Sequence, residues 1–396
     1  MKDRSLRTTL ILSALVAFAP MSIDMYLPAL PALERYFATD TASVQHTLAA
    51  FFIGLAAGQL LYGPLADRYG RKPPLYFGLV LYVAASAACA LAPDIASLIF
   101  LRFLQAVSGC AGMVVARAVV RDLYDRQESA RVFSILLMVM GIAPIVAPIA
   151  GGYLLTLSGW RSIFWVLALF GVACLVAVRW GLPETLAKHQ PRIPLSNAMR
   201  NYGGLFADRR FLGYALSGGF GQAGMFAYIS GSPFVFIDLY GVPAHAYGWL
   251  FAVNAAGIVA FTQLNRRLLL RHHSDRLLDF GNLAGFLACL LLLAAAISSA
   301  AGLAGILVPL FFIVSLRGLT FPNASAGAMA PFPEKAGSAS ALLGSVQFAI
   351  AAVASASVGA FHDGTAVPMA AVIAACGLLA FVSYRALAVR GAKQSG

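Results

Sequence analysis

Apolar runs of about twenty residues recur along the whole chain, and this repetition limits the fold more than any other feature. A helix of about twenty residues is long enough to cross a bilayer core of about 30 Å. We place twelve such runs, near residues 7–30, 45–65, 74–92, 96–118, 131–153, 161–182, 209–234, 247–268, 276–298, 302–324, 336–360 and 366–388. The sequence therefore predicts an all-α polytopic membrane protein with twelve transmembrane helices.

Composition supports this prediction, because 60% of the residues are hydrophobic and only 11% are charged. A soluble domain is closer to half apolar and a quarter charged. The basic start at Lys2, Arg4 and Arg7 followed by an apolar run resembles a signal peptide. No A-x-A-like cleavage site closes this run, and the later runs look the same, so we expect it to be the first span.

A polar stretch at 183–208 divides the spans into two groups of six, 1–182 and 209–396, the second with a short polar tail. Two six-helix halves joined by a linker are typical of secondary transporters, whose binding sites lie between the halves near the membrane midplane. We therefore expect a transporter in which each half is one domain.

The basic residues predict the orientation. Alternate loops, together with both termini, hold 23 of the 28 Lys and Arg residues, whereas the opposite loops hold only Arg35 and Arg161. The positive-inside rule then places both termini and the linker in the cytoplasm. This distribution accounts for the net charge of +12, so no nucleic-acid partner is expected.

Motif searches give no sign of an enzyme. The chain has no G-x-x-x-x-G-K-[ST] loop for ATP, no G-x-S-x-G and no H-E-x-x-H. The five cysteines lie singly in apolar runs, and the histidines lack ligand spacing. We expect no metal and no cofactor, with a proton as the only coupling ion.

The end of the first span carries an unusual group, since Asp24 is followed by Pro28 and Pro31. The first and fourth spans run in opposite directions, so Asp24 and Arg102 fall in the same outer half of the membrane and are predicted to pair. Ionisable residues within spans usually mark ion or substrate pathways, which favours a proton-coupling role for both. A structural salt bridge, or an Asp24 that only reaches the outer interface, is the alternative. The prolines are expected to break the helix and expose backbone groups to a wet cavity.

The string GPLADRYGRKPPL at 63–75 resembles the loop signature of the major facilitator superfamily. Gly63 is expected to permit close helix approach and Gly70 a two-residue reversal. The resemblance implies a major facilitator fold and a lock between the halves that forms in the outward-facing state and breaks in the inward-facing one. The residues assigned to this lock are Gly63, Asp67, Arg68, Gly70, Arg71 and Lys72.

The string GIAPIVAPIAGG at 141–152 resembles the antiporter signature of the same superfamily, with Ala147 in place of a glycine. Small residues allow close packing, and prolines are expected to bend the helix toward the other half. The resemblance implies exchange rather than symport, and assigns the motif to Gly141, Pro144, Pro148, Gly151 and Gly152.

Further strings resemble one branch of the superfamily. Arg102 and Gln105 match a fourth-span signature, and DMYLPALP at 24–31, VVRDLY at 119–124 and FAYISGSPFVFI at 226–237 occur together. Together they resemble the Bcr/CflA branch of drug:proton antiporters, which implies the inner membrane of a bacterium. Polar or aromatic residues in the spans are candidate substrate contacts: Tyr26, Gln105, Gln222, Phe226, Tyr228, Asn254 and Gln347. Tyr26, Asn254 and Gln347 can equally be helix-packing groups, and an aromatic belt near the outer surface is the alternative for Phe226 and Tyr228.

These observations predict a proton-coupled exporter of small, largely neutral drugs such as phenicols or bicyclomycin, complete as a monomer within membrane lipid. Asp24 is the only acidic residue placed within a span, so about one proton per neutral drug, and one net charge per cycle, is expected. Arg317, in the tenth span, has no obvious partner and is assigned either to the inward cavity or to the lock. The alternatives are a transporter of an endogenous metabolite and a membrane sensor that transports nothing.

Overall fold

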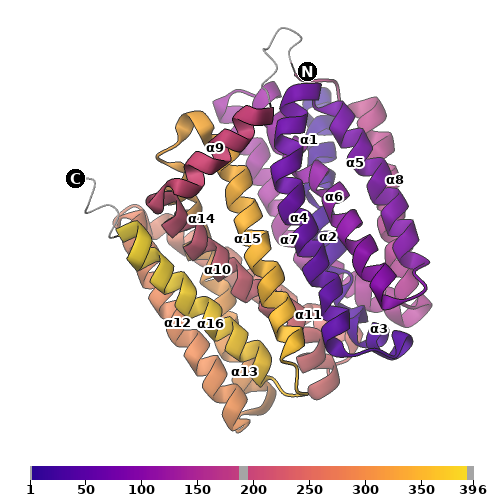
Figure 1. Ribbon diagram of the computed structural model, residues 1–396, viewed down its shortest axis with the longest axis vertical. Coiled ribbons are helices and arrows are strands. Elements are labelled where there is room, and N and C mark those ends of the chain that lie inside the picture. Colours follow the sequence, from indigo (N-terminus) through magenta and orange to yellow (C-terminus); the bar gives the residue numbers. More distant parts are fainter. Residues whose placement is uncertain (1, 187–194, 390–396) are drawn as a thin grey trace.

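The chain folds as a bundle of long helices that run roughly along one axis (Figure 1). The computed structural model describes residues 2–186 and 195–389, and contains no strand within them. Eleven helical segments in this part of the chain are long and apolar enough to cross a membrane. The remaining predicted span, the seventh at 209–234, corresponds to helix α10 (Arg209–Pro233), which is long enough but is rich in glycine and serine.

The elements were predicted in the right order, but most helices extend beyond the predicted apolar runs into polar flanks. The helices are α1 (Lys2–Val16), α2 (Phe18–Asp24), α3 (Leu30–Phe37), α4 (Thr41–Tyr69), α5 (Lys72–Ala90), α6 (Ile95–Leu123), α7 (Arg126–Ser158), α8 (Trp160–Gly181), α9 (Leu195–Ala207), α10 (Arg209–Pro233), α11 (Ala244–Leu268), α12 (Ser274–Ser298), α13 (Gly302–Ser315), α14 (Arg317–Met329), α15 (Ala336–Ala360) and α16 (Val367–Ser383). Short 3₁₀ turns η1 (Leu27–Ala29) and η3 (Pro333–Lys335) and π-helical turns η2 (Phe234–Leu239) and η4 (Tyr384–Val389) complete them.

Many large apolar side chains lie on the outside of the bundle and several polar ones lie inside, the reverse of what a soluble protein shows. Large apolar side chains lie on the outside, including Leu157 (80% exposed) and Leu270 (84%). Polar groups such as Gln45 and Arg102 are fully buried. This distribution is what a bilayer stabilises, because lipid solvates apolar surfaces and leaves polar groups to find partners inside.

The first span is broken into α1, α2, η1 and α3, which together run to Phe37 rather than ending near residue 30. Asp24 is the last residue of α2, Pro28 lies in the η1 turn and Pro31 lies in the first turn of α3. Proline suits the first turn of a helix because the amide hydrogen it lacks has no partner there. The break was therefore predicted, but Pro28 and its neighbours are buried and do not line a wet cavity.

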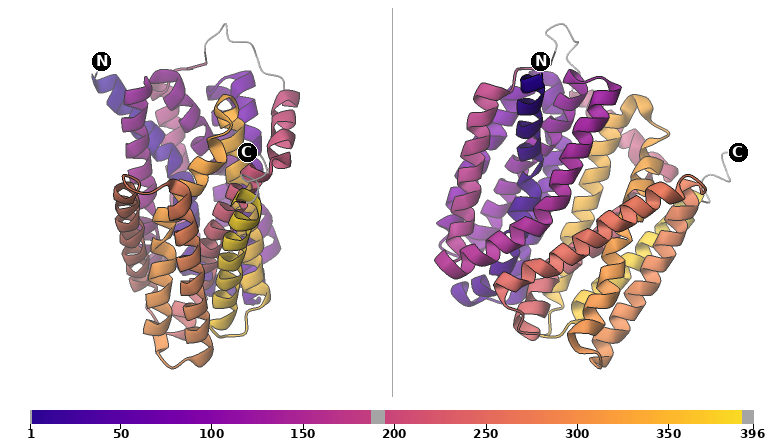
Figure 2. Two further views of the ribbon diagram at one scale, coloured as in Figure 1. Left: turned by 90° about the vertical axis from the view of Figure 1, so that its left-hand side faces the viewer. Right: turned by 180° about the vertical axis from the view of Figure 1, so that it is seen from behind.

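The first six spans (the N-terminal half, 2–186) and the last six (the C-terminal half, 209–389) pack along two helix pairs, α4 with α15 and α7 with α11. We call the end of the bundle that holds residue 2 and the end of η4 the basic end, since it carries most of the Lys and Arg residues (Figure 1). At the opposite end the halves meet closely, and Arg35 of α3 forms an ion pair with Asp238 of η2 at 3.4 Å. Figure 2 shows the two halves from the side and from behind.

The connection between the halves contains a helix that the sequence analysis left as linker, α9 at the basic end. Tyr202 of α9 donates a hydrogen bond from its hydroxyl to the Leu60 carbonyl, 3.4 Å away, on α4. Residues 187–194 of the predicted linker, and 390–396 of the predicted tail, lie outside the described residues.

Candidate functional site

Asp24 lies in the interior at the break in the first span. The residue is only 4% exposed, and its carboxyl forms no hydrogen bond or ion pair among the described residues. An ionised carboxylate without a cation or water costs several kcal/mol when buried. Asp24 can therefore ionise only when water, a cation or a hydrogen-bond donor reaches its carboxyl.

Arg102 is fully buried on α6 and is held by hydrogen bonds and aromatic rings. Its Nη1 donates to the Gln105 side-chain oxygen at 2.6 Å, and its Nη2 donates to the Ser22 carbonyl at 3.1 Å. The guanidinium lies over the rings of Tyr26 (4.4 Å to the ring centre) and Phe51 (4.2 Å). Contacts with two aromatic rings suit the planar, weakly hydrated arginine head group.

The predicted Asp24–Arg102 pair was therefore wrong for this conformation. The two residues do lie at similar depth, since Arg102 contacts the carbonyl of Ser22, two residues before Asp24. That carbonyl belongs to the last turn of α2, where no further helical amide follows to bind it. The helix break thus supplies Arg102 with a backbone acceptor instead of a carboxylate.

Asp24 lies near two tyrosines of the other half of the molecule. Its carboxyl lies within electrostatic reach of the hydroxyls of Tyr228 on α10 and Tyr247 on α11. Tyr228 accepts a hydrogen bond from Asn254 at 2.9 Å, and Tyr247 shares one with Ser232 at 2.6 Å. The structure thus brings together two of the predicted contacts, Tyr228 and Asn254, beside the predicted proton site.

The remaining candidate substrate contacts lie in separate places. Tyr26 is fully buried and bonded to Thr47 at 2.9 Å, and Gln105 joins Arg102 to Ser86. Both therefore act as packing groups in this conformation.

Phe226 lies between the halves, with its ring 4.5 Å from that of Phe52 and 5.8 Å from that of Phe348. Gln222 is partly exposed and contacts Met225, while the Gln347 amide nitrogen is buried without a partner among the described residues. These three belong to the central contact between α4, α10 and α15.

The turn at 70–71 has the predicted geometry. Helix α4 ends at Tyr69 and α5 begins at Lys72, and Gly70 takes φ +98°, a conformation that only glycine adopts without strain. Arg71 binds Asp67 at 2.5 Å and Asp122 at 2.8 Å. Burial works against the charged form of Arg71, but hydrogen bonds and charges from both carboxylates raise its pKa above the usual value.

Glu184 completes this turn from beyond the sixth span. Its carboxylate accepts the backbone amides of Arg71 (2.9 Å), Lys72 (3.0 Å), Thr185 (2.9 Å) and Leu186 (3.0 Å). Partial burial opposes ionisation, but these four amide donors together lower the pKa of Glu184. The charge network therefore ties three segments of the N-terminal half together.

One detail of the predicted lock differs from the structure. A Cβ at Gly63 would meet no atom of the described residues within 4 Å outside its own helix, and Gly63 lines a cavity, so its expected role in close packing was wrong for this conformation. The ion pairs of Asp67 and Arg71 stay within the N-terminal half, while Arg68 and Lys72 lie against the rings of Tyr69 and Tyr76. In this conformation the described residues of the motif form no ion pair with the C-terminal half.

The predicted antiporter motif lies on α7, which contains both Pro144 and Pro148. Gly151 and Gly152 pack closely, as expected: a side chain at Gly151 would collide with the Met25 carbonyl, and a Cβ at Gly152 would lie 2.6 Å from the Ala244 carbonyl. A Cβ at Gly141 would meet no atom of the described residues within 4 Å outside its own helix, so its predicted packing role was wrong for this conformation. The motif therefore contacts the residue after Asp24 and also the start of α11 in the other half.

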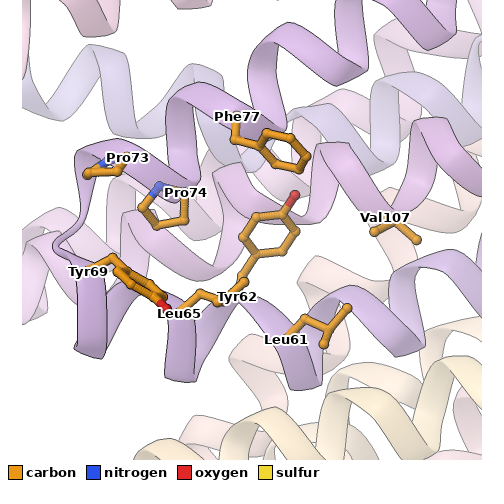
Figure 3. Close-up of a pocket in the computed structure, with 8 residues that line it drawn as sticks. All are labelled: Leu61, Tyr62, Leu65, Tyr69, Pro73, Pro74, Phe77 and Val107. Atoms are coloured by element: carbon orange, nitrogen blue, oxygen red, sulfur yellow. The ribbon is translucent and has the colours of Figure 1, made fainter. Parts of the chain in front are cut away.

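Two cavities differ in character. An apolar pocket of 310 Å³ lies between α4, α5 and α6, and Figure 3 shows its lining. Phe77 and Leu61 on its wall are 66% and 51% exposed. In a membrane protein such an apolar outer surface faces lipid chains, so this pocket is not a candidate transport site.

A cavity of 560 Å³ lies at the basic end, between the halves. Its wall combines α4, α6 and α7 of the N-terminal half with α9 and α15. The halves are thus separated at the basic end and in contact at the opposite end, which is one of the two arrangements that alternating access requires.

Several site residues were missed by the sequence analysis. Arg117 on α6 lines this cavity, Tyr247 lies near Asp24, and Asp122 and Glu184 complete the Arg71 network. Arg117 was detectable as a cation within a span. The others depend on which helices are neighbours, and their sequence signal is weak.

Arg317 is buried at the start of α14, against Gly221 and Gly285. It forms no hydrogen bond or ion pair among the described residues, and it is not on the wall of the basic-end cavity. Its predicted role in cavity or lock therefore stays a prediction.

Comparison with known proteins identifies the family. A model of the Major Facilitator Superfamily matches residues 12–356. The chain belongs to the major facilitator superfamily. It is 32% identical to the bicyclomycin resistance protein homolog of Haemophilus influenzae, covering 98% of this chain and 97% of that protein. It is 31% identical to a chloramphenicol resistance protein of Pseudomonas aeruginosa, over 85% and 79% of the two chains.

A third relative, the uncharacterized MFS-type transporter YdgK of Bacillus subtilis, is 36% identical over 96% of this chain and 95% of that protein. Among solved structures, a D-xylose-proton symporter superposes with a TM-score of 0.75 over 96% and 97% of the chains, at 15% identity. The bicyclomycin and chloramphenicol resistance relatives confirm the predicted Bcr/CflA branch. The family match and the structural likeness confirm the major facilitator fold, and the chain is a bacterial multi-pass membrane protein. The chain is a transporter and not an enzyme.

Proposed function

We propose that this transporter exports small, largely neutral drugs such as phenicols or bicyclomycin in exchange for protons. The proton would be bound by Asp24. The relatives named for bicyclomycin and chloramphenicol resistance support the cargo class, and the antiporter signature supports exchange. The basic end would face the cytoplasm of the inner membrane, as the distribution of Lys and Arg favours. No partner protein is required, because one chain supplies both halves.

The observation that carries the proposal is the position of Asp24. Asp24 is buried at a helix break without a bonded partner among the described residues, and the carbonyl of the next residue packs against Gly151 of the antiporter motif. The carboxyl of Asp24 lies within electrostatic reach of Tyr228 and Tyr247 of the other half. A change of its charge therefore acts directly on the contact between the halves.

This arrangement links protonation to conformation. When the carboxyl is neutral, its buried position between the halves carries no charge penalty. When it is ionised, it needs water or a hydrogen-bond donor, and the hydroxyls of Tyr228 and Tyr247 lie within its electrostatic reach. Arg102 would act as a positioning residue, because it holds the Ser22 carbonyl and so fixes the break that presents Asp24.

Substrate-triggered proton release from energised inside-out vesicles tests the proposal. Phenicols, bicyclomycin and lipophilic cations would be added to vesicles holding the wild-type protein or Asp24→Asn. Release by the wild type alone supports antiport through Asp24, and the active compounds define the cargo. Equal release by the variant would place the proton elsewhere, and no release with any compound would favour an endogenous metabolite as cargo.

A further inference from the structure

The cavity at the basic end has an unbalanced charge. Its charged lining residues are two acids and four bases, so the wall carries two positive charges in excess. Asp67 is already bound by Arg71. Glu334 and Lys335 are neighbours in the chain and opposite in sign.

The excess comes from Arg117 and Arg121 of α6. Neither forms a hydrogen bond or an ion pair with any residue that the structure describes, although Arg117 is partly buried. They are four residues apart, so they lie on the same face of the helix. Like charges at this spacing repel each other, and an anion between them would remove that repulsion.

The rest of the wall suits an organic anion better than a small inorganic one. Val114 and Phe133 supply apolar surface near the arginines, while Gln59, Asn201 and Tyr202 supply amide and hydroxyl groups. The volume of 560 Å³ falls within the range of sites for drug-sized ligands. A low-dielectric cavity lined by one sign of charge also concentrates the opposite ion.

We infer that this cavity binds amphipathic organic anions, with Arg117 and Arg121 as the pair that binds a carboxylate or comparable group. The inference rests on the proposed function, since it treats the basic end as the entrance for cargo. It extends the cargo beyond neutral drugs. Exporting a monoanion for one inward proton would move two charges per cycle rather than one.

The test compares two ligands that differ in one anionic group. Chloramphenicol and its hemisuccinate ester would be titrated calorimetrically into the purified full-length protein at pH 7 and fixed ionic strength. The wild type is expected to bind the hemisuccinate about tenfold more tightly, since hydrogen bonds to charged groups are worth that much or more. Arg117→Gln and Arg121→Gln should each lose about tenfold for the hemisuccinate and less than about twofold for chloramphenicol.

Arg271→Gln is the matched control, because Arg271 is exposed at the same end and is absent from the cavity wall. It should leave both affinities unchanged. Arg117→Lys keeps the charge and should restore part of the hemisuccinate affinity, and retained chloramphenicol binding shows that a variant is folded.

Equal affinity of the wild type for both ligands, or binding of neither, would overturn the inference. So would an equal loss for both ligands in the glutamine variants, or the same loss in Arg271→Gln. Because binding is measured without a proton gradient, its outcome is independent of whether neutral phenicols release protons, which tests the proposed function separately.

Discussion

Replacing Arg102 by lysine should destabilise the protein even though the charge is kept. The guanidinium donates to Gln105 and to the Ser22 carbonyl at the same time, and also lies over the rings of Tyr26 and Phe51. The single ammonium nitrogen of lysine cannot bridge both acceptors while stacking on both rings. One acceptor would be left buried without a donor.

The size of the effect follows from these contacts. A hydrogen bond from a charged donor contributes about 1.5–3 kcal/mol, and a desolvated cation–ring contact about 2 kcal/mol. Losing one hydrogen bond and part of the stacking should lower the free energy of unfolding by about 2–4 kcal/mol. Asp24→Asn should change it little, since Asp24 has no bonded partner among the described residues.

A thiol-reactive fluorescent dye can follow unfolding in detergent, because all five cysteines are free and buried. Thermal unfolding of Arg102→Lys, Asp24→Asn and the double variant completes a double-mutant cycle. The two effects should add within about 0.5 kcal/mol. An unchanged stability in Arg102→Lys would show that these contacts contribute little, and a coupling well above that value would restore the predicted ion pair.

Three further predictions follow from the structure. Glu184→Gln should loosen the 70–71 turn, because an amide oxygen accepts fewer of the four backbone amides. Since the pKa of Glu184 is lowered, the contribution of Glu184 to stability should be complete above about pH 4.3 and be lost only as the pH falls further. Thermal unfolding followed by circular dichroism at several pH values would show this. Gly151→Leu should abolish transport while Gly141→Ala is tolerated, because only a side chain at 151 would collide with a backbone carbonyl, that of Met25. Equal drug accumulation in cells expressing either variant would contradict this. Arg35→Asp should weaken closure of the end opposite the basic end and raise thiol labelling of a cysteine introduced there. Adding Asp238→Arg should reverse the increase in labelling. The free energy of unfolding should change by less than about 1 kcal/mol, because the Arg35–Asp238 pair is largely exposed.

The sequence was sufficient for the order of the helices, for the break at Pro28 and for the Gly70 reversal, because each depends on local chemistry. Apolar length identifies spans, proline interrupts them and glycine permits a positive φ. The extra helix α9 was missed because its polar composition resembles that of a linker.

The contacts of the site were predicted less well. Depth along a helix placed Arg102 near Asp24, but depth does not say which face each side chain occupies, and Arg102 faces the Ser22 carbonyl and aromatic rings instead. Gly63 and Gly141 match their motifs, yet a Cβ at either would meet no atom of the described residues within 4 Å outside its own helix. Which glycine contacts which backbone depends on how the whole bundle packs.

Proteoliposomes with an imposed pH gradient can show whether Asp24 carries the exchanged proton. Uptake of a radiolabelled phenicol would be compared for the wild type, Asp24→Asn and the exposed control Asp363→Asn, together with drug–drug exchange at equal pH. Asp24→Asn should lose gradient-driven accumulation but keep drug–drug exchange, while Asp363→Asn should behave as the wild type. Gradient-driven accumulation by Asp24→Asn at the wild-type level would contradict this role of Asp24.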